Sequence, residues 1–75
     1  MPYIAIRAYP KDEELVRDLV EKVNQVVIDT VGCPPEAVNI SFEPVEPADW
    51  QEHVAEGEMA NNAAFMRILK GQRLQ

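Results

Sequence analysis

The chain has 75 residues, a single cysteine and a formal net charge of −6. A domain of this size buries only about 60% of the surface of its unfolded chain, so its core is thin. The negative charge argues against a nucleic-acid partner, Cys33 has no second cysteine for an intrachain disulfide, and no apolar run approaches the length of a membrane span. We expect one domain over residues 1–75 of a cytoplasmic protein.

The first predicted element is a strand over residues 2–9. Its side chains alternate with a period of two, which is typical of a strand with one buried face. One face carries Ile4, Ile6 and Ala8, and the other carries Tyr3, Ala5 and Arg7. Pro10 ends the strand.

A helix is predicted over residues 13–31. Asp12 is a candidate for its N-terminal cap, and Gly32 suits the left-handed residue that closes a helix. Apolar side chains recur at intervals of three and four residues, which indicates one buried helix face. They are Val16, Leu19, Val20, Val23, Val26, Val27 and Val31.

A second alternating run, residues 38–43, predicts another strand, limited by Pro44 to an edge or an end. Strand, helix and strand form a βαβ core over residues 2–45, with parallel strands. A two-stranded sheet is marginal in water, and its apolar face exceeds what one helix covers. We therefore expect two chains to pair edge to edge into a four-stranded sheet with two helices on one face.

Residues 46–75 are predicted to form a C-terminal helical extension. A short helix starts near Pro47 and includes Trp50 and His53, and Gly57 is expected to end it. A weaker helical pattern follows over residues 59–70, and residues 71–75 are expected to form a mobile tail. The predicted fold class is α/β (α+β).

The start of the chain, Met1-Pro2, carries the candidate chemistry. Removal of Met1 would leave Pro2 with a secondary amine at the end of a strand. Such an amine acts as a base when neutral, as an acid when protonated and as an imine-forming nucleophile. Many chains begin with Met-Pro without any such role, so the dipeptide alone is a weak signal.

Several segments together resemble the 4-oxalocrotonate tautomerase family, and its small PptA-like members in particular. They are Met1-Pro2-Tyr3-Ile4, the βαβ core with its long helix, residues 38–43 (VNISFE) and residues 47–50 (PADW). The resemblance covers residues 2 to about 52 and rests on the order and spacing of these segments. It implies a tautomerase-like βαβ fold that assembles as a homodimer or as a trimer of dimers. The extended C-terminus favours the dimer over the hexamer.

The resemblance also implies roles for individual residues. Pro2 would move a proton between carbon and oxygen of an enol acid, with its pKa lowered by apolar surroundings or a nearby cation. Lys11 falls near the position of a carboxylate-binding arginine, although this loop is one residue shorter. Trp50 falls on the position of an aromatic residue that lines the pocket.

Asn39 departs from the family pattern, because members that act on dicarboxylates have an arginine there. Asparagine can polarise an enol or carbonyl oxygen but cannot pair with a second carboxylate. A mono-acid such as an arylpyruvate is therefore the expected substrate. Arg7 could compensate by binding the carboxylate, or it could form a salt bridge with Glu43.

The predicted function is a cofactor-free enol–keto tautomerase. His53 is more simply a surface or packing histidine than a base, and it lacks neighbours at metal-ligand spacing. The alternative is a non-catalytic dimeric βαβ module that binds a small molecule or a protein. It explains the apolar residues equally well and gives Pro2 no role.

Overall fold

A computed structural model describes every residue from Met1 to Gln75 and shows an α+β protein. The chain forms two compact units, Met1–Val45 and Glu46–Gln75. The first contains β1 (Tyr3–Ala8), α1 (Glu13–Val31), the 3₁₀ turn η1 (Pro35–Ala37) and β2 (Asn39–Pro44). The second contains α2 (Pro47–Trp50), η2 (Gln51–Met59), η3 (Ala63–Phe65), β3 (Ile68–Leu69) and β4 (Gln72–Arg73).

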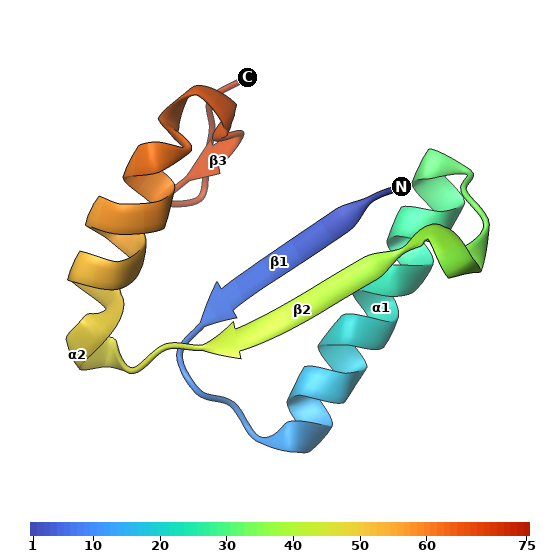
Figure 1. Cartoon of the computed structure of the whole chain (residues 1–75), viewed down its shortest axis with the longest axis horizontal. Helices are drawn as coiled ribbons and strands as arrows, with labels where there is room; N and C mark the ends of the chain where they lie inside the picture. The colour runs from blue at the N-terminus through green and yellow to red at the C-terminus, as the bar shows by residue number, and fades with distance from the viewer. The chain divides into compact units, whose positions relative to one another are not determined.

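The sheet of the first unit is a parallel pair. Its register runs from Tyr3 opposite Asn39 to Ala8 opposite Pro44. Figure 1 shows both arrows pointing the same way, with α1 lying alongside them. The prediction of two parallel strands joined by a long helix is therefore confirmed.

Both ends of α1 are formed as its sequence predicts. The backbone N–H of Leu15 donates to Oδ1 of Asp12 over 2.9 Å, which satisfies one of the free donors of the first turn. Gly32 has a φ of 76°, and its N–H donates to the carbonyl of Ile28 over 2.9 Å. The helix therefore spans residues 13–31, as predicted.

The apolar stripe of α1 is wider than the sheet it covers. No residue of this helix is fully buried. Val26 and Val31, expected on the buried face, are 61% and 62% exposed. The buried apolar residues of this unit are Ala37 and Val45 alone. A single chain thus leaves much of its apolar surface in contact with water.

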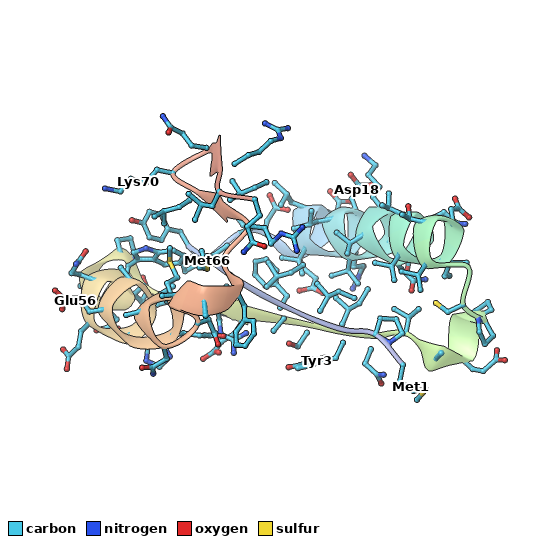
Figure 2. The ribbon with its side chains drawn as sticks, turned by 90° about the horizontal axis from the view of Figure 1, so that it is seen from above. Met1, Tyr3, Asp18, Glu56, Met66 and Lys70 are labelled. Atoms are coloured by element: carbon cyan, nitrogen blue, oxygen red, sulfur yellow. The ribbon has the colours of Figure 1, made fainter.

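The two faces of the sheet differ in chemistry. Ile4 lies opposite Ile40 and Ile6 lies opposite Phe42, so these half-buried side chains form one apolar face. Tyr3 belongs to the other face, and Figure 2 shows it on the side of the sheet away from α1. On this second face Tyr3 and Asn39 are exposed, whereas Arg7 and Ser41 are half-buried.

The second unit starts with one helix over residues 47–61 rather than two. Its middle part, η2, is a π-helix of nine residues, and the helix continues through Gly57. The predicted break at Gly57 is therefore wrong. A Cβ atom on Gly57 would lie 3.0 Å from the carbonyl oxygen of Glu52, five residues earlier. Glycine here permits the wide π turn instead of ending the helix.

The end of the second unit is a small hairpin where a helix was expected. After the turn η3, β3 and β4 pair antiparallel, with Ile68 opposite Arg73. Lys70 and Gly71 connect them with φ values of 51° and 79°, the positive values that a type I′ turn requires. The C-terminal extension is thus only partly helical. No helix in the structure combines the length and the apolar character needed to cross a membrane.

Candidate functional site

Pro2 lies immediately before β1, and its carbonyl group is fixed by β2. The backbone N–H of Asn39 donates to the Pro2 carbonyl oxygen over 3.1 Å. The side-chain Nδ2 of Asn39 approaches the same oxygen at 3.4 Å, a longer and weaker contact. Pro2 is half-buried, so its ring sits at a defined place at the strand end.

Met1 precedes Pro2 in this structure and is 94% exposed. The Pro2 nitrogen is therefore a tertiary amide here and has no basic lone pair. Removal of Met1 would convert this amide nitrogen into a secondary amine. The chemistry of Pro2 thus depends on whether Met1 is removed.

The amide of Asn39 bridges two backbone carbonyls. Besides Pro2, its Nδ2 donates to the carbonyl of Ala37 over 3.2 Å. Both partners are acceptors, so the nitrogen of the amide must face them. Asn39 would have to give up one of these bonds to polarise a substrate oxygen with its N–H.

A pair of hydroxyl groups lies next to Asn39 on the polar face. The hydroxyl of Tyr3 is 3.2 Å from Oγ of Ser41, and either can be the donor. Tyr3 is directly opposite Asn39 in the sheet. The sequence predicted Tyr3 only as a strand residue and predicted no role for Ser41. Only the strand register, across 38 residues, shows that they meet.

Arg7 is paired with a carboxylate. Its Nε lies 2.8 Å from Oε1 of Glu43, and its side chain is only 22% exposed. The two residues are opposite each other in the sheet. Of the two alternatives for Arg7, the structure therefore shows the salt bridge with Glu43.

Lys11 lies at the other end of β1 from Pro2. It is exposed, in the loop between β1 and α1. The six residues of β1 lie between the two, which at a strand rise near 3.3 Å corresponds to roughly 20 Å. Figure 1 shows the N-terminus and this loop at opposite ends of the strand. One small substrate cannot touch Pro2 and Lys11 of the same chain.

The remaining candidates belong to the second unit. Trp50 is the last residue of α2 and is half-buried, whereas His53 is exposed. The pocket-lining role of Trp50 stays a prediction. No group of three or more histidine, cysteine, aspartate or glutamate side chains is arranged to hold a metal ion.

Comparison with known proteins assigns no family, because no family model and no curated protein matches the chain. The resemblance to the 4-oxalocrotonate tautomerases therefore rests on the residues named above and stays a prediction.

Proposed function

We propose that the protein is a cofactor-free enol–keto tautomerase in which the amine of Pro2, freed by removal of Met1, is the general acid and base. The observation that carries this proposal is the placement of Pro2. It stands half-buried at the start of β1, with its carbonyl held by two donors of Asn39. A free amine there would be fixed in position, which general acid–base catalysis requires.

The proposed reaction moves one proton and needs no redox partner. The neutral amine of Pro2 accepts the hydroxyl proton of the enol, and the resulting ammonium delivers a proton to the neighbouring carbon. The carbon–carbon double bond becomes a single bond, and the carbon–oxygen single bond becomes a carbonyl group. The hydroxyl pair of Tyr3 and Ser41 is suited to donate a hydrogen bond to the oxygen on which charge develops.

Lys11 is the better carboxylate anchor of the two basic candidates. Arg7 is engaged by Glu43 at 2.8 Å, and pairing with a substrate would mean breaking that contact. Lys11 is exposed and offers a single charge without bidentate geometry. One such cation suits a small mono-acid such as an arylpyruvate.

The distance between Pro2 and Lys11 supports a proposed site that is shared by two chains. In a two-fold symmetric dimer joined edge to edge, the strands that meet run antiparallel. If β1 is that edge, Pro2 of one chain approaches the partner's Lys11. Pro44 lies in β2, and proline is typical of an edge that stays unpaired. We therefore propose a homodimer with a four-stranded, tautomerase-like sheet centred on two β1 strands, located in the cytoplasm.

The backbone of β1 shows which residues would form this contact. The carbonyls of Pro2 and Ala8 accept from the N–H groups of Asn39 in β2 and of Val45 just after it, so the even-numbered residues of β1 face β2. The N–H of Ala5 then points to the free edge. Ala5→Pro removes that donor and should give a monomer, measured by light scattering. Ile40→Pro, which removes a donor from the free edge of β2, should leave the dimer. The reverse result would place the interface on β2.

The decisive experiment is the ketonisation of an arylpyruvate enol, followed from pH 5 to pH 9. The protein is first shown by intact mass to lack Met1. Pro2→Ala should lower kcat/KM by about 10² or more, the scale of general acid–base catalysis. A chain with one alanine inserted between Met1 and Pro2 keeps the proline acylated and should be equally inactive. Equal rates in all three proteins would rule out the proline mechanism and favour the non-catalytic binding module.

A mixing experiment tests the shared site. Pro2→Ala and Lys11→Ala chains, each inactive alone, are mixed, unfolded and refolded together. Random pairing makes about half of the dimers heterodimers, with one chain of each variant. Each heterodimer has one intact pair of Pro2 and Lys11 out of two, so about a quarter of wild-type activity should return. If both residues acted from one chain, no activity would return.

A further inference from the structure

The sequence predicts that Asn39 polarises an oxygen of the substrate. In the structure, Asn39 instead contacts Pro2. Its backbone N–H and its side-chain Nδ2 both approach the Pro2 carbonyl oxygen, at 3.1 and 3.4 Å. The same Nδ2 donates to the carbonyl of Ala37 at 3.2 Å. One side chain thus links the start of β1 to the turn that precedes β2.

These contacts matter because few others hold the start of β1. Pro2 has no backbone N–H, so it cannot donate to the ladder. Its carbonyl is the group that joins it to β2, and Asn39 supplies both of the donors that reach it. Without Met1 the residue would be the end of the chain, where strands fray most easily.

We infer that Asn39 is a positioning residue, which holds Pro2 in place through its carbonyl group and does not bind the substrate. The inference rests on the proposed function, because it assigns Asn39 a task in the same reaction. The Asn39 amide donates its hydrogens to two backbone carbonyls. It therefore positions Pro2, the proposed base, and has no hydrogen left for the substrate oxygen. An aspartate of the same shape would place an oxygen against those carbonyls and repel them.

The kinetic test separates positioning from substrate binding. Asn39→Ala keeps the backbone donor and removes the side-chain contacts. It should lower kcat on the order of fivefold, the factor that one net hydrogen bond corresponds to, and leave KM unchanged. Asn39→Asp should lower kcat at least as much. Asn61→Ala, an exposed asparagine of the second unit, serves as the matched control and should change neither constant. A higher KM with unchanged kcat would overturn the inference and assign Asn39 to the substrate.

A second measurement does not depend on activity. Protein lacking Met1 is labelled with ¹⁵N-proline and ¹³C-carbonyl proline, and the resonances of Pro2 are followed through a pH titration. The N–H donors of Asn39 disfavour a positive charge nearby, so Asn39→Ala should raise the pKa of the Pro2 amine and shift its carbonyl resonance. Identical titrations in wild type and variant would overturn the inference. An inactive wild type with a shifted titration would refute the tautomerase proposal and leave the positioning contact established.

Discussion

The helices of the two units begin and end in different ways. In α1, Asp12 caps the first turn with its side chain, and Gly32 closes the last turn with a φ of 76°. The helix over residues 47–61 starts at Pro47 after Glu46, whose side chain makes no capping bond. It also changes to a π-helix for nine residues. The first helix is thus defined by its own ends, whereas the second depends on its interior geometry.

The two units also differ in how well their phenylalanine side chains are buried. Phe42 of β2 is half-buried on the apolar face of the sheet, opposite Ile6, and β2 contacts α1. Phe65 of η3 is 78% exposed. Each unit has one phenylalanine. Phe42 packs within the first unit, whereas Phe65 is largely exposed in the second. This difference makes the two residues a matched pair for experiment.

The largest expected effect is that of Phe42→Ala. Truncating a fully buried phenylalanine costs about 3–5 kcal/mol, and a half-buried one should cost about 2 kcal/mol. Phe65→Ala should change the free energy of unfolding by less than about 0.5 kcal/mol. Urea denaturation of both variants at one fixed protein concentration measures the difference. Equal losses would mean that Phe65 is buried against another surface in solution.

The next effect concerns the helix starts. Asp12→Ala removes the bond to the N–H of Leu15, at 2.9 Å, and should cost about 1 kcal/mol. Glu46 occupies the corresponding position of the second helix, where its side chain makes no capping bond. Glu46→Ala should therefore leave the free energy of unfolding almost unchanged. Thermal unfolding by circular dichroism compares the two. A large loss in Glu46→Ala would contradict the difference between the helix starts.

The same contrast explains which parts of the fold could be predicted. For α1, the cap, the apolar spacing and the closing glycine all indicate the same bounds. For the second unit, Gly57 was the main signal, and a glycine can either end a helix or make room within one. The hairpin was missed because its turn is Lys70-Gly71, and lysine is not the asparagine or aspartate that usually marks a type I′ turn.

The candidate site shows a similar division. The salt bridge of Arg7 with Glu43 could be named from the two alternating strands once they were assumed to be parallel. The contact of Asn39 with Pro2 could not be predicted in this way. It depends on the strand register between residues that lie 37 positions apart in the sequence, and on the turn at Ala37. The separation of Lys11 from Pro2 follows from the length of β1, and it is the reason why the proposed site combines residues of two chains.

A smaller effect is expected from Gly57→Ala, and its sign is informative. In an ordinary α-helix, replacing glycine by alanine stabilises by roughly 1 kcal/mol. Here the added Cβ would meet the carbonyl oxygen of Glu52 at 3.0 Å, so the gain should be absent or turn into a loss. Ala60→Gly, in the α-helical end of the same helix, should cost about 1 kcal/mol as a control. A full gain in Gly57→Ala would show that the helix is not π-helical there.

The smallest effect concerns the exposed face of α1, where Figure 2 shows Asp18 on the outer side. Nζ of Lys22 lies 2.8 Å from Oδ2 of Asp18, and this hydrogen bond, followed by the charge of Asp18, raises the pKa of Lys22 above its ordinary value of 10.5. The folded state therefore binds this proton more tightly than the unfolded state. The contribution of the pair to stability is fully present below that ordinary value and is lost as the pH rises through the raised pKa.

Asp18→Asn should consequently lower the midpoint of thermal unfolding slightly at neutral pH, and the difference from wild type should vanish in the strongly alkaline range. Glu13→Gln provides the control, because Glu13 pairs with Arg17 at 3.6 Å and a guanidinium does not titrate there. Any small effect of that variant should persist where the effect of Asp18→Asn has disappeared. A pH-independent difference in Asp18→Asn would show that Asp18 acts through the helix dipole rather than through Lys22.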